Sequence, residues 1–124
     1  MARAKLTVTA MLAVAMGCSS GGGSSGVEGT KTVSTLDETD KAAFCDWMSG
    51  KLAGGYDRPI VCGGETIDHT DSSQAECVQD FPSCDATVAQ LEGCVGKAID
   101  VLCDEEALAR AKASADCLAA IDCL

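Results

Sequence analysis

The chain of 124 residues contains nine cysteines, whose thiolates could ligate a metal, exchange disulfides or form stable cross-links. Eight of them lie after residue 44 and are separated, in order, by 16, 14, 6, 9, 8, 13 and 5 residues. None of these gaps is the two-residue spacing typical of zinc sites, iron–sulfur sites and redox-active cysteine pairs. We therefore predict four structural disulfides formed outside the cytosol. The eight cysteines are Cys45, Cys62, Cys77, Cys84, Cys94, Cys103, Cys117 and Cys123.

A loop expected over residues 57–76 carries the only histidine of the chain, and four carboxylates cluster around it between residues 65 and 76. A histidine beside an aspartate could act as a base or hold a metal, and carboxylates near glycine could bind calcium. However, no Gly-x-Ser-x-Gly motif, second histidine or EF-hand order accompanies them. We interpret the loop as solvated and expect no catalytic residue, metal or cofactor, with a metal-dependent hydrolase as the alternative. The candidate residues are Glu65, Asp68, His69, Asp71 and Glu76.

Two of the four aromatic residues, Phe44 and Trp47, lie three positions apart in a segment with helical periodicity. They therefore share one face of the expected helix. We assign both to the hydrophobic core. The alternative is that they form an exposed patch that binds a partner protein.

The amino terminus has the organisation of an export signal. Arg3 and Lys5 precede a mostly apolar run over residues 6–16, which is too short to span a bilayer. The sequence Ala15-Met16-Gly17-Cys18 that follows resembles the lipobox of bacterial lipoproteins. This resemblance implies a signal peptide over residues 1–17, cleavage before Cys18 and attachment of acyl chains such as palmitate to that cysteine.

Two further features agree with a lipid anchor. The sequence after Cys18 reads SSGGGSSG, which is typical of a flexible spacer, and we assign residues 18–35 to the tether and 36–124 to the folded domain. Lipidation also leaves eight cysteines, an even number that can all pair. The alternative is cleavage after Ala15, which fits the small-x-small rule and would give a freely secreted inhibitor or effector.

The charge of the chain excludes some partners. The precursor has a net charge of −10, and removal of Arg3 and Lys5 leaves 7 basic and 19 acidic residues, or −12. Such an acidic protein is not expected to bind nucleic acid or anionic lipid headgroups. We therefore expect contact with the membrane through acyl chains on Cys18, and a protein of the cell envelope as a further partner.

Capping signals and helical spacing predict helices in the part of the chain that contains the cysteines. Thr35 to Glu38 matches a capping box, and the helix that it begins should end at Gly54-Gly55. Residues 56–71 are rich in glycine and short polar side chains and should be irregular, with at most a brief strand at Ile60-Val61. Ser73 should cap a short helix, which a following Phe-Pro pair stops.

Two longer helices are expected in the last third of the chain. Asp85 should cap a helix that runs to about Cys103, and Asp104 or Glu105 should begin another that runs to about Ile121. The first of these has an apolar stripe. Its members are Val88, Leu91, Val95, Ala98, Ile99 and Leu102.

Helical phase restricts the disulfide pairing without deciding it. Cys94 and Cys103 are nine residues apart, about 180° around a continuous helix, so they should bridge to two different neighbours and this helix should lie in the middle of the domain. A nested pairing of Cys94 with Cys123 and of Cys103 with Cys117 is disfavoured for the same reason. Cys117 lies opposite the apolar stripe of its own helix, so either it meets another element or the helix bends near Ser114. Eight cysteines allow 105 pairings.

The sequence thus predicts a mainly α, disulfide-stapled domain of three to four helices with an irregular, glycine-rich loop region. Beyond the signal, the chain is similar to small cysteine-rich exported lipoproteins with helical cores. The functional hypothesis is a lipid-anchored cell-envelope protein, on the periplasmic or outer-surface face, that acts as a non-catalytic binding or structural module.

Overall fold

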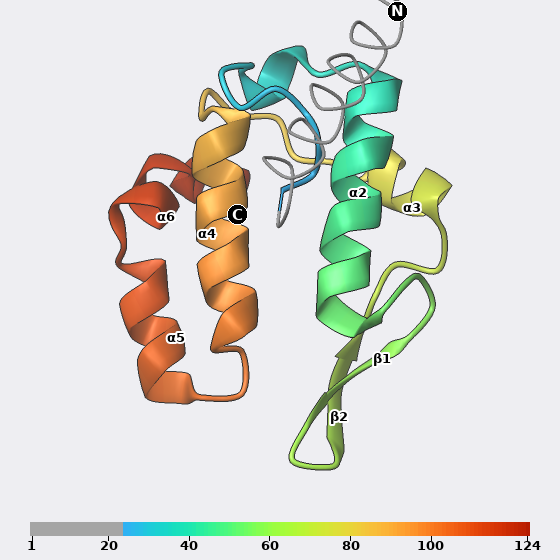
Figure 1. Ribbon diagram of the computed structural model, residues 1–124, viewed down its shortest axis with the longest axis vertical. Coiled ribbons are helices and arrows are strands. Elements are labelled where there is room, and N and C mark those ends of the chain that lie inside the picture. Colours follow the sequence, from blue (N-terminus) through green and yellow to red (C-terminus); the bar gives the residue numbers. More distant parts are fainter. Residues whose placement is uncertain (1–23) are drawn as a thin grey trace, which may run out of the picture.

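The computed structural model describes residues 24–124 (Figure 1). The predicted signal peptide over residues 1–17, the lipid acceptor Cys18 and the tether as far as residue 23 lie outside the described residues. The domain is mainly helical and held by four disulfides, which confirms the predicted fold class. Its elements are η1 (Val33–Thr35), α2 (Glu38–Ala53), β1 (Pro59–Cys62), β2 (Glu65–His69), α3 (Gln74–Gln79), α4 (Val88–Asp100), α5 (Glu105–Lys112), α6 (Ala115–Ala119) and η2 (Ile121–Cys123).

The helices are arranged around α4. In Figure 1, α4 lies between α2 on one side and α5 and α6 on the other, as the phase of its cysteines predicted. The short helix α3 lies beside α2, and the β1–β2 hairpin extends from the end of α2. None of the described helices is both long enough and apolar enough to cross a membrane.

The end of α2 and the start of α3 lie where the sequence predicted them, but the residue that caps α2 differs from the prediction. Gly54 ends α2 in the left-handed conformation, with φ of 82°, and the Ser73 hydroxyl caps α3 by accepting a hydrogen bond from the Glu76 amide. The predicted capping box at Thr35 is wrong, because Asp37 caps α2 instead. The Thr35 hydroxyl donates to the Thr32 carbonyl at 2.7 Å and thereby closes the η1 turn.

The two later helices are shorter than predicted. Thr87, rather than Asp85, caps α4 in a complete capping box with Gln90, and α4 ends at Asp100, before Cys103. The expected fourth helix is divided into α5 and α6. The first part ends at Lys112 and Ser114 caps the second, so the bend expected near Ser114 is present.

The region expected to be an irregular loop contains an antiparallel hairpin. Cys62 pairs with Glu65 across a two-residue turn formed by Gly63 and Gly64, whose φ angles are 60° and 85°. Two consecutive positive φ angles are characteristic of the turn that matches the twist of paired strands, and glycine adopts them without strain. The Gly-Gly pair was therefore a hairpin signal, and the brief strand expected at Ile60-Val61 is part of β1.

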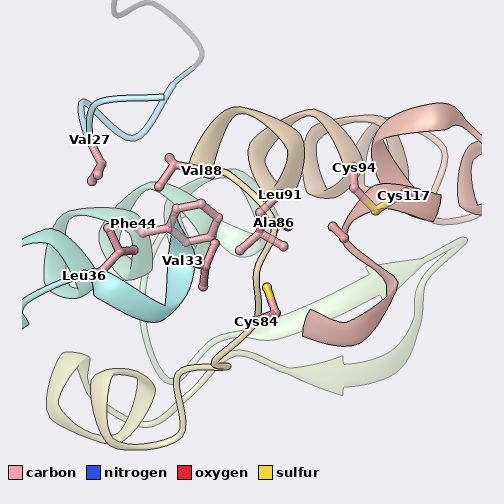
Figure 2. Close-up of a cluster of buried hydrophobic side chains, with 11 residues drawn as sticks. Val27, Val33, Leu36, Phe44, Cys84, Ala86, Val88, Leu91, Cys94 and Cys117 are labelled. Atoms are coloured by element: carbon pink, nitrogen blue, oxygen red, sulfur yellow. A yellow bond between two sulfur atoms is a disulfide. The ribbon is translucent and has the colours of Figure 1, made fainter. Parts of the chain in front are cut away.

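The predicted tether is too long, because residues 24–35 belong to the domain. Val33 is fully buried, and Val27 and Leu36 join it in the core with Phe44 and Val88 (Figure 2). The backbone of this segment pairs with the segment before α4: the Val33 amide donates to the Ala86 carbonyl at 2.9 Å. The paired backbone segments are 50 or more positions apart in the sequence, so the local polar composition of residues 24–35 did not indicate the pairing.

Candidate functional site

The eight cysteines of the domain pair as four disulfides, and each bond joins different elements. Cys94 and Cys103 bridge to different neighbours, as predicted, and the disfavoured nested pairing is absent. Because α4 ends before Cys103, the separation of the two cysteines comes partly from the turn that follows the helix. The bonds are Cys45–Cys77 (α2 to α3), Cys62–Cys103 (β1 to the turn after α4), Cys84–Cys123 (the segment before α4 to η2) and Cys94–Cys117 (α4 to α6).

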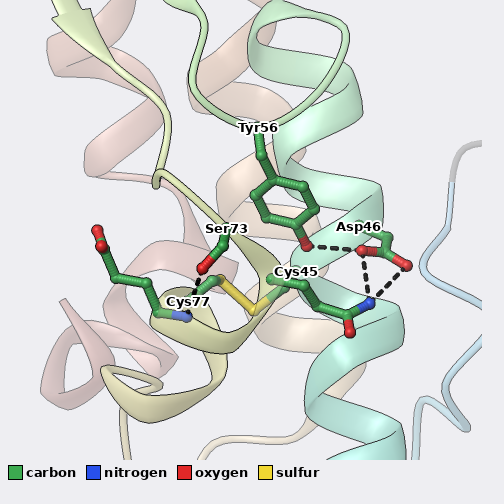
Figure 3. Close-up of a disulfide and its surroundings, with 7 residues drawn as sticks. Cys45, Asp46, Tyr56, Ser73 and Cys77 are labelled. Atoms are coloured by element: carbon green, nitrogen blue, oxygen red, sulfur yellow. Dashed lines mark hydrogen bonds between the residues drawn. A yellow bond between two sulfur atoms is a disulfide. The ribbon is translucent and has the colours of Figure 1, made fainter.

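A polar network surrounds the bond between α2 and α3 (Figure 3). The Tyr56 hydroxyl donates to the Asp46 carboxylate at 2.6 Å, and the Gln74 amide donates to both oxygens of the same carboxylate at 2.9 and 3.0 Å. Partial burial and the neighbouring Asp46 raise the pKa of Tyr56 well above its usual range. These contacts fix the chain after α2 against α3, which gives the network a structural role.

Three of the five candidate residues of the 57–76 region do not join a common site. Glu65, Asp68 and His69 are exposed on β2. The Asp68 carboxylate accepts a hydrogen bond from the backbone amide of His69, so its contact with that residue does not involve the imidazole. In the described part of the chain, the histidine does not join a group of three metal-ligating side chains.

Asp71 and Glu76 do come together, with a third carboxylate that sequence reasoning missed. Ligand oxygens of Asp71, Glu76 and Asp80, which we call the acidic cluster, lie within 4.8 Å of one another. Burial raises the pKa of Asp71, and the negative charges of Glu76 and Asp80 raise it further. Asp80 is four residues after Glu76 around α3, and this spacing was the signal that could have identified it.

An apolar groove begins beside the acidic cluster and follows α4. A first cavity of about 210 Å³ is bounded by apolar side chains of α2, α4 and the α3–α4 connection, with Asp71 and Asp80 at its edge. A second cavity of about 290 Å³ continues between α2, α4 and α5, with Lys112 at its edge. Val95 and Leu124 line both cavities, so the two are adjacent. We call this surface the α2–α4 groove. Its main apolar side chains are Met48, Leu52, Phe81, Val95, Ile99 and Leu102.

The second half of the predicted apolar stripe of α4 lines the groove and is less buried than the first half. Val88 and Leu91, in the first turn of the helix, are buried, whereas Val95, Ile99 and Leu102 are only half-buried. The amino-terminal half of α4 packs under Phe44 and the segment before α2. Towards the other end of α4, the stripe is only partly covered and lines the groove.

The two aromatic candidates have different positions. Phe44 is 2% exposed, so it is a core residue, and its ring also contributes to the first cavity. Trp47 is half-buried and packs edge-on against Phe44, with 5.1 Å between ring centroids. Lys51 lies over the Trp47 ring at 5.8 Å. The two residues therefore do not form an exposed patch, and the α2–α4 groove replaces it as the candidate binding surface.

A comparison with protein-family models, curated proteins and solved structures found no match to this chain. The groove, the disulfides and the amino-terminal sequence are therefore the features of the chain that indicate its function.

Proposed function

We propose that this protein is an exported, lipid-anchored component of the bacterial cell envelope whose domain is a non-catalytic binding module. The α2–α4 groove is its binding surface. The observation that carries the proposal is that the second half of the α4 stripe is only partly buried and lines two cavities, because helices normally bury such a stripe fully against the protein interior. Four disulfides hold the surrounding elements and are consistent with a location outside the cytoplasm.

The lipid anchor is supported by the sequence around Cys18 and by the count of cysteines. Ala15-Met16-Gly17-Cys18 resembles a lipobox, and the other eight cysteines pair among themselves. The ninth thiol is thereby left for an acyl chain. More than one acyl chain on that residue would make attachment to the membrane durable.

Mass spectrometry of the mature amino terminus tests the anchor. We expect an acylated Cys18 as the first residue and recovery of the protein with the membrane fraction. The Cys18→Ser variant should lose both properties, whereas Ser19→Ala, its neighbour, should retain them. A mature chain that begins at an unmodified Met16 would establish free secretion instead and contradict the anchor.

Site-specific photo-crosslinking in the envelope tests the binding surface. A photoreactive residue at Leu102, inside the groove, should give a discrete adduct with a partner protein. The same residue at Glu106, which is exposed and outside the groove, is the matched control and should give none. Equal adducts at the two positions, or none at either, would contradict the groove as the binding surface.

A further inference from the structure

The α2–α4 groove has opposite charges at its two ends. Asp71 and Asp80 lie at the edge of the first cavity, and Glu76 adds a third negative charge to the same cluster. Lys112 lies at the edge of the second cavity. Among residues 24–124, the ion pairs involve other acidic groups, namely Asp40, Asp116 and Glu106. The acidic cluster therefore has no cation against it and carries mutual repulsion that a basic ligand would relieve.

The dimensions of the groove indicate which shape would fill it. Leu91 and Ile99 are eight residues apart on α4, which corresponds to about 12 Å along the helix axis, or about two turns, and Leu102 lies in the turn that follows the helix. Each cavity is smaller than the roughly 300–1,000 Å³ of typical small-molecule pockets. Two small, adjacent cavities along one helix suit successive side chains of one face of a third helix, the arrangement of helix-in-groove recognition.

We infer that the α2–α4 groove binds an amphipathic helical segment of a partner protein. Apolar side chains at helical spacing fill the two cavities, and a lysine or arginine at one end of the segment lies against Asp71 and Asp80. An acidic residue at the other end of the segment lies near Lys112. This inference rests on the proposed function, and it deepens that function by specifying the chemistry of the partner.

A designed peptide tests the inference on the full chain, purified with its disulfides oxidised. The probe is a helical peptide of about 15 residues with leucines at i, i+3, i+7 and i+10, two lysines at one end and two glutamates at the other. A second peptide replaces the two lysines with glutamates. Binding is measured by the anisotropy of labelled peptide and by the fluorescence of Trp47, the only tryptophan, which packs on Phe44 beside the groove.

Charge reversal of the protein supplies the decisive comparison. We expect the lysine peptide to bind the wild-type protein and Asp80→Lys to weaken it by about fivefold or more, because an attraction becomes a repulsion. Asp100→Lys makes the same charge change on α4 at an exposed position outside the groove and should alter binding by less than about twofold. The peptide with glutamates in place of lysines should bind Asp80→Lys better than wild type, which a misfolded variant would not do.

Each other outcome overturns the inference. Equal effects of Asp80→Lys and Asp100→Lys would show that only net charge matters. Unchanged binding to Ile99→Glu would show that the peptide lies elsewhere. No binding of the lysine peptide would show that the groove does not take a basic amphipathic helix. None of these results concerns the acylation of Cys18 or a groove-specific crosslink, so failure of this inference is distinguishable from failure of the proposed function.

Discussion

Two disulfides of the domain allow loop entropy to be separated from packing. Cys94 and Cys117 are both buried, at 3% and 1% exposed, and enclose a separation of 23 residues. The Cys62–Cys103 bond encloses 41 residues, but Cys62 is half-buried and Cys103 is exposed. If loop entropy alone decides, Cys62–Cys103 is the more stabilising bond. If packing of the cysteines decides, Cys94–Cys117 is the more stabilising bond.

The free energies expected from the two effects indicate that packing outweighs loop entropy. Loop-closure entropy gives about 3.4 kcal/mol for 23 residues and about 3.9 kcal/mol for 41 residues at 25 °C. Replacing two buried cysteines with alanine adds a loss of about 1 kcal/mol for each sulfur removed from the core. We therefore expect C94A/C117A to lower the free energy of unfolding by about 5 kcal/mol and C62A/C103A to lower it by about 4 kcal/mol.

Urea unfolding at 25 °C, followed by Trp47 fluorescence and by circular dichroism, measures both variants. The absence of free thiols in each variant confirms that the other three bonds have formed. We expect the lower midpoint for C94A/C117A, and a larger slope than wild type for both variants because their unfolded chains are less constrained. A lower free energy of unfolding for C62A/C103A would show that loop entropy dominates and refute the reasoning.

Three smaller perturbations test other parts of the fold. Gly96→Ala should raise stability by about 0.5–1 kcal/mol, because no atom lies near the added methyl group. Gly93→Ala should raise it less, because the Asp116 carboxylate of α6 occupies the space that the methyl group would need. Thermal unfolding of the two variants tests this difference. Val33→Ala should lower the free energy of unfolding in urea by about 2 kcal/mol, because Val33 is fully buried. Val61→Ala, at a half-exposed position, should lower it by less than about 0.5 kcal/mol. Equal losses would contradict the placement of residues 24–35 in the domain. Asp71→Asn should raise stability at pH 7 by a few tenths of a kcal/mol, because the folded state raises the pKa of Asp71 and thus penalises its ionised form. Unfolding measured across pH should show that this gain disappears below about pH 3.8, where the carboxyl is protonated in both states. A gain that is independent of pH would contradict this explanation.

Features set by a few neighbouring residues were predictable from the sequence. The cap at Ser73 and the end of α2 at Gly54 depend on a side chain or a backbone conformation within the same turn. Thr87 was harder to choose, because Asp85 is an equally good capping residue two positions earlier. Tertiary packing decides between them: Ala86 and Val88 are both buried, so the helix must begin after the segment that pairs with residue 33.

Features set by distant residues were not predictable. The segment over residues 24–35 has no strong local preference, and its place in the core comes from pairing with residues 84–89. The apolar stripe of α4 was visible in the sequence, but which half is covered depends on where Phe44 and the first segment pack. Asp80 joins the acidic cluster because α3 ends beside Asp71, and that juxtaposition depends on the Cys45–Cys77 bond, whose pairing the sequence left open.

A disulfide that lies outside the α2–α4 groove, Cys62–Cys103, is also expected to affect binding in it. Among the four disulfides, Cys62–Cys103 is the one that joins β1, in the hairpin that follows α2, to the turn that follows α4, so we expect it to restrain the ends of the two helices relative to each other. Neither cysteine lines a groove cavity. We therefore expect folded C62A/C103A to bind the lysine peptide about three- to tenfold more weakly, because binding must now order the loosened helices. Unchanged affinity in a variant that is shown to be folded would mean that the core around Phe44 fixes both sides of the groove without this bond.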